Sequence, residues 1–213
     1  MLTLYGMSSS GNCYKPRLLL AKLGRPFRHV EVNAMDGSTH SPEFLALNPN
    51  GKVPLLQLED GRILAESNAM LLYLAEGTSY LPDAGFERAL VYQWMFFEQY
   101  SHEPYIAVLR ALKKYPERAH QATPERVAQL LDGGHKALAV MEMQLSKTRF
   151  IAGDDYSVAD IALYAYTQDA AFAGYDMTRF PHITAWLERV ATHEGHVPME
   201  WLPEGSAALS PGD

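Results

Sequence analysis

The pattern of the sequence changes near residue 77, and this change constrains the fold more than any other feature. Residues 1–76 alternate short apolar runs with helical patterns, whereas residues 86–213 carry one helical pattern after another. Residues 77–85 contain turn formers and no apolar periodicity. We therefore predict an α/β unit over 1–76, a linker over 77–85 and an all-helical unit over 86–213. The small, polar and Gly/Pro-rich residues after Pro203 predict a frayed tail.

The first unit has the order β-α-β-α-β-β-α. A strand–helix–strand crossover makes its first two strands parallel. Asp60 and Gly61 lie between the last two apolar runs and predict a tight antiparallel hairpin in which both residues take positive φ. A small mixed sheet with helices packed on it follows from this order. The expected strands are 2–5, 28–32, 53–59 and 62–65, and the expected helices are 13–23, 41–47 and 67–76.

Proline and capping residues divide the helical unit. Phe86–Leu112 has one long helical pattern, in which Pro104 predicts a bend or a helix boundary. Ser157 and Asp160 have the spacing of a capping box, which predicts the start of a buried helix. Further helices are expected to follow Thr123 and Pro181.

Charge and cysteine content exclude several classes of function. The 213 residues include 18 Lys and Arg against 25 Asp and Glu, a net charge of −7, which argues against nucleic-acid binding. No apolar run reaches about 18 residues, so we expect no membrane-spanning helix. The single cysteine, Cys13, excludes an internal disulfide and a thiolate zinc cluster, and no histidine pair has tight metal-ligand spacing. We therefore expect no metal cofactor. Because Met1–Gly6 lacks a secretory pattern, we expect a cytoplasmic protein.

Three short motifs carry polar groups at the ends of predicted strands and helices. They are Ser10–Cys13 after the first strand, Asn48–Pro54 before the third, and Glu66–Ala69 at the start of a helix. Together with an α/β half followed by a helical half, their order and spacing over residues 2–200 resemble the glutathione transferase family. The first motif is most similar to the serine-type branch, with theta- and zeta-like members. The resemblance implies a thioredoxin-like first unit, glutathione as co-substrate, and a homodimer.

The resemblance implies that Ser10 stabilises the glutathione thiolate. Ser10 stands at the first position of the Cys-x-x-Cys motif of thiol-redox members of the fold, and Cys13 stands at the second. A hydroxyl forms no mixed disulfide, but it donates a hydrogen bond to a thiolate. Lowering a free thiol pKa of about 8.5 by about 2 units requires about 2.7 kcal/mol. One charge-assisted hydrogen bond and a nearby helix N-terminus supply about that much.

Other residues near the first strand compete for the same role. Ser8 and Ser9 also carry hydroxyls that compete for it, but Ser10 stands at the spacing that the resemblance implies. Asn12 is the second candidate donor to the sulfur. Tyr5 is a rival activator, since some branches of the family use a tyrosine there, but its spacing favours a half-buried strand residue. We expect Cys13 to be a packing residue of the first helical turn, because a redox role would need a partner thiol.

The second and third motifs are expected to hold the tripeptide. In the fold that the resemblance implies, the proline matching Pro54 is cis, and the backbone of Val53 pairs with the cysteinyl unit as a short added strand. The sequence leaves the isomer open. Ser67 as N-cap leaves backbone donors for the γ-glutamyl carboxylate, and Glu66 beside it can take the α-ammonium.

Basic and apolar residues complete the expected site. Lys52 and His40 are candidates for the glycyl carboxylate, by resemblance to members with basic groups there. Met7, Tyr105 and Ile106 are candidates for the pocket of the second substrate. The apolar segment around residues 94–105 is expected to pack on its own unit. Its remaining surface is expected either to be buried against a second copy or to line an open apolar pocket.

We therefore predict a glutathione transferase that joins the thiolate to a small apolar electrophile. A second interpretation keeps the same site but uses glutathione to reduce disulfides or peroxides. A third is a non-catalytic scaffold that binds a protein partner through its helical unit. Only Ser10 matches the zeta-type serine run, so maleylacetoacetate isomerisation is not favoured.

Overall fold

The computed structural model describes residues 1–209 and divides into two compact units. The first unit combines residues 1–76 with the segment from Glu194 onward, and the second comprises Gly77–His193. The division after Glu76 coincides with the change of pattern in the sequence. Residues 194–209 differ from expectation, because they belong to the α/β unit and include a strand. No helix within residues 1–209 combines the length and apolar character needed to span a membrane.

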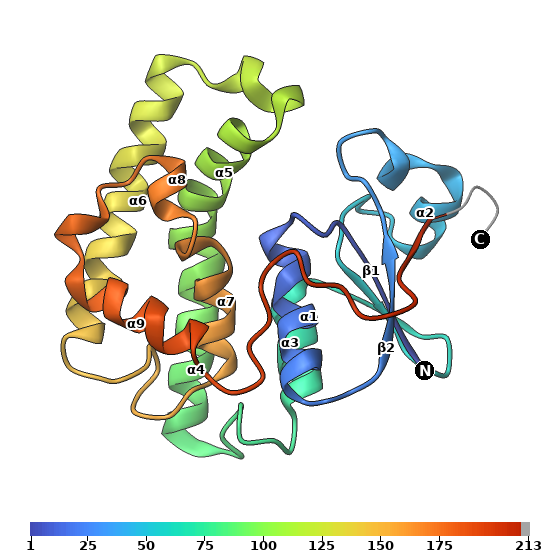
Figure 1. The fold of residues 1–213 in the computed structure, drawn as a ribbon, viewed down its shortest axis with the longest axis horizontal. Helices are drawn as coiled ribbons and strands as arrows, with labels where there is room; N and C mark the ends of the chain where they lie inside the picture. Colours follow the sequence, from blue (N-terminus) through green and yellow to red (C-terminus); the bar gives the residue numbers. More distant parts are fainter. Residues whose placement is uncertain (210–213) are drawn as a thin grey trace. The chain divides into compact units, whose positions relative to one another are not determined.

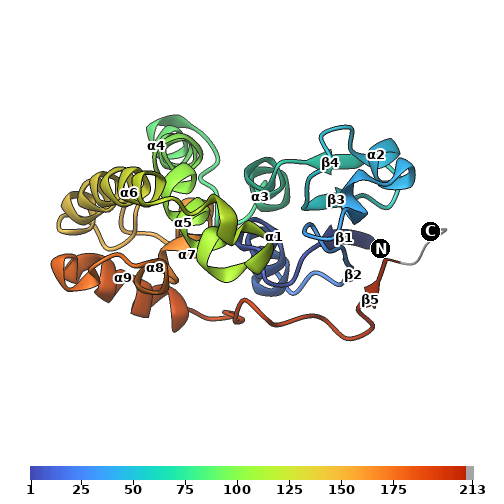
Figure 2. The ribbon, with the colours of Figure 1, turned by 90° about the horizontal axis from the view of Figure 1, so that it is seen from above.

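The first unit contains a mixed sheet with strand order β4-β3-β1-β2-β5. Strands β1 and β2 are parallel, and β3 runs antiparallel to both β1 and β4. Figure 2 shows helices α1 and α3 side by side on one face of the sheet and α2 on the other. The elements are β1 (Leu2–Gly6), α1 (Gly11–Lys22), β2 (Phe27–Glu31), α2 (Pro42–Leu47), β3 (Leu55–Gln57), β4 (Ile63–Ala65), α3 (Ser67–Ala75) and β5 (Ala207–Ala208).

Buried aliphatic and aromatic side chains hold α2 against the sheet. Phe44 of α2 packs with Val30 and Leu55, and all three are almost completely buried. Ser41 caps α2 and Pro42 occupies its first position, as the sequence predicted. This packing fixes the position of the loop from α2 to β3, which carries the second motif.

Strand β5 replaces the frayed tail that the sequence predicted. Val30 and Glu31 of β2 pair with Ala207 and Ala208, and the Leu209 amide donates to the Glu31 carbonyl at 2.9 Å. For the described residues of this tail the prediction was wrong, because β2 would otherwise be an edge strand with unpaired backbone groups. Strand pairing uses backbone N–H and C=O groups, so it requires no apolar side-chain pattern. Ala207 and Ala208 can therefore form the added strand. Residues 210–213 of the predicted tail lie outside the described residues.

The hairpin between β3 and β4 exists, but its turn differs from the prediction. Leu58 and Arg62 form the closing pair, since the Leu58 amide donates to the Arg62 carbonyl at 2.8 Å. Gly61 has φ 86°, whereas among the described non-glycine residues Glu66 alone has positive φ. Three residues therefore form the loop, with one left-handed glycine after a turn, and Asp60 keeps negative φ.

The second unit is helical, and Pro104 marks a boundary as predicted. A π-helical turn, Glu98–His102, separates α4 from α5, and Pro104 lies in the first turn of α5, where its missing N–H has no helical partner. Short 3-10 turns cover Ser38–His40 in the first unit and Pro116–Gln121 and Met177–Arg179 in the second. The helices are α4 (Gly85–Phe97), α5 (Glu103–Lys114), α6 (Pro124–Leu145), α7 (Val158–Thr167), α8 (Ala170–Ala173) and α9 (Pro181–Ala191).

Helix α7 is a buried helix of the second unit and lies beside α4 (Figure 1). All of its residues are buried, and it packs against α4, α5 and α9. The predicted capping box is confirmed: the Ser157 amide donates to an Asp160 carboxylate oxygen at 2.9 Å. The other oxygen of Asp160 accepts from the Ile151 amide at 2.9 Å and from the Trp186 indole at 2.8 Å. One buried carboxylate thus ties together three segments of the helical core.

Candidate active site

Ser10 lies at the positive end of α1, as its N-cap. The helix begins at Gly11, two residues earlier than the sequence predicted. The Ser10 hydroxyl oxygen accepts from the Cys13 amide at 3.5 Å, and the side chain is half-buried. The Ser10 side chain also shares a hydrogen bond with the Cys13 side chain, and a thiol is a weak partner for a hydroxyl. This position therefore combines a donor with the favourable potential of a helix N-terminus for an anion.

Helix α3 begins at Ser67, and its N-cap lies one residue earlier than predicted. Glu66, not Ser67, is the N-cap, so the expected capping role of Ser67 is wrong. A single residue joins β4 to α3, and Glu66 makes the reversal with φ 67° and ψ 113°. Such a conformation costs about 1–3 kcal/mol in a non-glycine residue and is concentrated at functional sites. The Glu66 side chain is exposed, whereas Ser67 is buried in the first helical position.

The N-terminal turns of α1 and α3 are joined by side-chain hydrogen bonds. The Ser67 hydroxyl donates to Asn12 Oδ1 at 3.3 Å. One turn further along, Lys15 Nζ donates to Asn68 Oδ1 at 3.4 Å, and Lys15 is fully buried. The structure thus brings the first and third motifs together. Sequence reasoning missed Lys15, because a lysine within a helical pattern usually indicates a solvent-facing position.

The second motif precedes β3, next to β1. The peptide bond between Val53 and Pro54 is cis. Pro54 is buried and Val53 is half-buried. The next residue, Leu55, pairs with Tyr5 of β1. The motif therefore lies at the start of β3, the strand beside β1, near the C-terminal end of β1. Asn48 closes the loop from the other side, since its amide donates to the Lys52 carbonyl at 2.8 Å.

Two basic side chains flank Gly51 in this loop. A Cβ built on Gly51 would lie 3.2 Å from His40 Nε2 and 3.1 Å from the Thr39 carbonyl, and Gly51 has φ 60°. Glycine therefore allows the close approach of His40. The His40 Nδ1 and the Thr39 hydroxyl lie 3.1 Å apart. His40 and Lys52 are both exposed, so either can reach a carboxylate in solvent.

The two rival groups near Ser10 have structural roles. The Tyr5 hydroxyl donates to Gln57 Oε1 at 3.2 Å, across the pair β1 and β3. Cys13 is completely buried, and its sulfur accepts from the Met7 amide at 3.3 Å. Burial raises the pKa of Cys13 to about 11. This thiol is therefore protonated at neutral pH, in agreement with the packing role expected for it.

The three candidates for the second-substrate pocket differ in exposure. Met7 is 7% exposed in the first unit, and Ile106 of α5 is fully buried in the second. Tyr105 is half-buried, and a Cβ built on Gly133 of α6 would lie 2.3 Å from its ring. The ring therefore packs directly on the α6 backbone. Their role in binding an electrophile stays a prediction.

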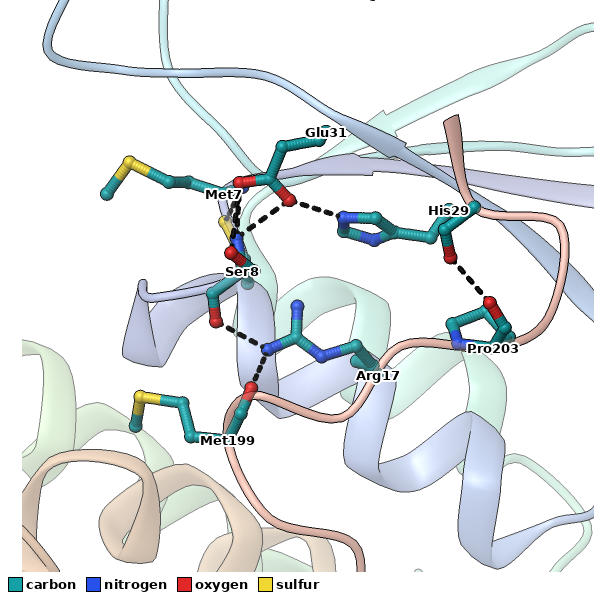
Figure 3. Close-up of polar contacts among 9 residues, drawn as sticks. Met7, Ser8, Arg17, His29, Glu31, Met199 and Pro203 are labelled. Carbon is teal, nitrogen blue, oxygen red and sulfur yellow. Dashed lines mark hydrogen bonds and ion pairs between the residues drawn. The ribbon is translucent and has the colours of Figure 1, made fainter. Parts of the chain in front are cut away.

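A polar network around Ser8 was not predicted (Figure 3). It joins Arg17, His29 and Glu31 to the backbone of Ser8. Arg17 and His29 are fully buried. Partial burial acts to raise the pKa of Glu31, but hydrogen bonds from His29 and Ser8 outweigh it and lower that pKa. No local sequence pattern indicates these residues, because the network joins α1 and β2 through the turn that follows β1.

Comparison with known proteins gives the same family for both units. Family models described as glutathione S-transferase, N-terminal domain and C-terminal domain match residues 1–76 and 124–189. A crystal structure of a glutathione S-transferase from Pseudomonas fluorescens Pf-5 is 50% identical, with a TM-score of 0.89, and the match covers 93% of this chain and 98% of that one. Glutathione S-transferase GstB of Escherichia coli K12 is 31% identical over 196 residues, 89% of this chain and 93% of the relative. Disulfide-bond oxidoreductase YfcG of the same strain is 28% identical, over 89% of this chain and 90% of the relative. The chain therefore belongs to the glutathione S-transferase family.

Proposed function

We propose that the first unit binds glutathione and that its thiolate attacks a small apolar electrophile. The hydrogen bond from the Ser67 hydroxyl to Asn12 Oδ1, at 3.3 Å, is the observation that carries this proposal. It holds the N-terminus of α3, suited to a carboxylate, beside the first turn of α1, where Ser10 can donate to a sulfur. A molecule with an anionic end and a thiol fits this pair of groups.

Ser10 is the residue that we propose for thiolate stabilisation. Its hydroxyl and the N-terminus of α1 together would lower the thiol pKa by about 2 units, equivalent to about 2.7 kcal/mol. Asn12 is the second donor that we propose, from the first turn of the same helix. The buried Cys13 does not compete as a nucleophile, because its pKa is raised to about 11.

The remaining contacts would hold the ends of the tripeptide. The backbone of Val53, before Pro54, would pair with the cysteinyl unit. Ser67 and the α3 N-terminus would take the γ-glutamyl carboxylate, and the exposed carboxylate of Glu66 its ammonium. The glycyl carboxylate would face His40, which lies against Gly51, and Lys52, which follows Gly51 in the sequence.

The reaction is a nucleophilic substitution. The thiolate sulfur supplies the electron pair of a new bond to carbon, and a leaving group such as chloride departs with its own pair. The protein contributes thiolate formation and proximity. Met7 is the residue of the first unit that we propose beside the electrophile, and Tyr105 and Ile106 stay candidates in the second unit. The serine-type branch and the homodimer also stay predictions, although Phe96 and Tyr100 expose apolar surface that a second copy could cover.

The Ser10→Ala variant tests the mechanism. Conjugation of glutathione to an aryl halide is expected to fall about 100-fold in kcat, because about 2 units of thiol pKa shift are lost. The KM for glutathione should change less than about twofold, since the tripeptide contacts are made elsewhere. Ser9→Ala, in the same turn, is the matched control. Unchanged turnover in Ser10→Ala would remove Ser10 from the mechanism.

Disulfide reduction is the second candidate, favoured by the similarity to a disulfide-bond oxidoreductase. Because Cys13 is buried and protonated, the reducing electrons would come from two glutathione molecules. The first would form a mixed disulfide with the substrate and release one thiolate, and the second would release the other as oxidised glutathione forms. Assays of hydroxyethyl disulfide and an organic hydroperoxide beside the aryl halide separate this activity from conjugation. Calorimetric titration without binding at millimolar glutathione would favour the scaffold instead.

A further inference from the structure

Two side chains of opposite charge form hydrogen bonds with the backbone of the turn that precedes Ser10 (Figure 3). Residues Met7 to Ser10 form a tight turn, since the Ser10 amide donates to the Met7 carbonyl at 3.0 Å. Ser8 is the second residue of this turn. A Glu31 carboxylate oxygen accepts from the Ser8 amide at 2.8 Å, and Arg17 Nη2 donates to the Ser8 carbonyl at 2.7 Å. Two successive peptide groups are thus held, one by an anion and one by a cation.

Glu31 reaches the turn because the sheet register places it there. It is the last residue of β2 and lies opposite Gly6, the last residue of β1. Its carboxylate also accepts from the Ser8 hydroxyl at 3.1 Å and contacts His29 Nε2 at 2.9 Å. Since His29 is fully buried, the carboxylate has a fixed partner on the side away from the turn. These contacts leave Glu31 little freedom to rotate.

Arg17 reaches the turn from inside α1. It is fully buried, and its Nη2 donates to the Met199 carbonyl of the C-terminal segment as well as to Ser8. Its Nε and Nη1 are also buried and have no hydrogen-bond partner among the described residues. An apolar side chain of similar length would be buried at lower cost. Stability alone therefore does not account for an arginine here.

We infer that Glu31 and Arg17 are positioning residues that fix the Met7–Ser10 turn and thereby the direction of the Ser10 hydroxyl. Any rotation of the turn would break a charge-assisted hydrogen bond on each side of Ser8. A small displacement of a donor reduces its effect on a developing or resident charge severely. The inference rests on the proposed function, in which the Ser10 hydroxyl donates to the thiolate.

The variant Glu31→Gln separates positioning from a direct charge effect. A carboxylate near the thiolate disfavours it, so removal of that charge would by itself lower the thiol pKa. Glutamine offers Ser8 one neutral amide oxygen in place of two carboxylate oxygens, so the hydrogen bonds to the Ser8 amide and hydroxyl weaken. If these bonds direct the Ser10 hydroxyl, the same pKa rises. The two explanations therefore predict opposite signs. Glu200→Gln is the matched control, because Glu200 is exposed and acts on Arg17 only through its charge.

The thiol pKa is measured from the ultraviolet absorbance of bound glutathione thiolate against pH, together with kcat and KM for aryl halide conjugation. Glu31→Gln is expected to raise the thiol pKa by about 1 unit and to lower kcat about tenfold at neutral pH, with KM for glutathione changed less than about twofold. Glu200→Gln should match the wild type. Ser8→Ala, which removes only the 3.1 Å hydroxyl contact, should lower kcat about twofold and serves if Glu31→Gln folds poorly.

Failure of this inference and failure of the proposed function give different results. A wild type that lowers the thiol pKa, with Glu31→Gln unchanged or lower still, overturns the positioning role alone. A wild type without bound thiolate at neutral pH overturns both. Amide hydrogen exchange of the ligand-free protein adds a readout independent of activity, and Glu31→Gln should speed exchange at Ser8 and Ser10 about tenfold. Unchanged exchange would overturn the claim that Glu31 stabilises the Met7–Ser10 turn.

Discussion

Two serines cap helices in this molecule, and they differ in what their hydroxyls do. Ser157 caps α7 in the second unit; it is buried, and its hydroxyl accepts from the Ala159 amide at 3.3 Å and donates to Asp160 at 3.2 Å. Ser10 caps α1 in the first unit; it is half-buried, and its oxygen accepts a long contact from the Cys13 amide at 3.5 Å. The Ser157 hydroxyl both accepts and donates within its own capping box. The Ser10 hydroxyl shares a hydrogen bond with the Cys13 side chain, a weaker partner than a carboxylate.

The residue three positions after each serine accounts for the difference. After Ser157 this residue is Asp160, whose carboxylate closes a capping box. After Ser10 it is Cys13, a buried and protonated thiol. A closed box stabilises the helix, whereas an open cap leaves a donor at the positive end of the helix. The same residue type at the same position thus serves stability in one unit and is proposed to serve chemistry in the other.

Opening the box at α7 should have the largest effect. In Asp160→Asn the amide nitrogen would face the Ser157 amide, donor against donor, in a fully buried site. We expect the free energy of unfolding to fall by about 3 kcal/mol, because buried donors lose a charged acceptor. Urea denaturation followed by circular dichroism measures this. Asp155→Asn, an exposed carboxylate before the helix, is the control and should lie within about 0.5 kcal/mol of the wild type.

Truncation of each serine to alanine compares the two caps directly. Ser157→Ala should cost about 2 kcal/mol, at the upper end for an N-cap, because the loss is buried. Ser10→Ala should cost about 0.5 kcal/mol, since its cap contact is long and half-exposed. The same denaturation experiment measures both, and the ratio is the informative quantity. Equal losses would show that the α1 cap is as structural as the α7 cap.

Local signals explain which features the sequence predicted. The capping box at Ser157, the boundary at Pro104 and the start of α2 at Ser41 each depend on residues within one helical turn. Strand β5 and the left-handed Glu66 depend on the rest of the fold, because one fills an open sheet edge and the other closes a one-residue connection. Patterns along the chain cannot show either.

The candidate site divides in the same way. The three motifs indicated Ser10, Pro54 and Ser67, because strand ends and helix starts carry recognisable residues. The grip of Glu31 and Arg17 on Ser8 was missed, since it joins β2 and α1 across the end of β1. The burial of Arg17 in α1 depends on the elements packed around that helix, so the sequence of the helix alone does not predict it.

The buried Cys13 thiol in the first turn of α1 gives a smaller effect than the loss of the Ser157 cap, a dependence of stability on pH. Burial raises the pKa of Cys13 from 9.0 to about 11, so the folded state holds this proton when the unfolded state has lost it. The contribution is complete below about pH 9 and is lost as the pH rises toward about 11, because the unfolded chain then binds fewer protons. Cys13→Ala lacks this thiol, so the difference in unfolding free energy between wild type and variant should shrink by about 1 kcal/mol between pH 8 and pH 10. Lys and Tyr titrations affect both proteins alike, so only a constant difference across this range would show that the Cys13 thiol ionises as readily in the fold as outside it.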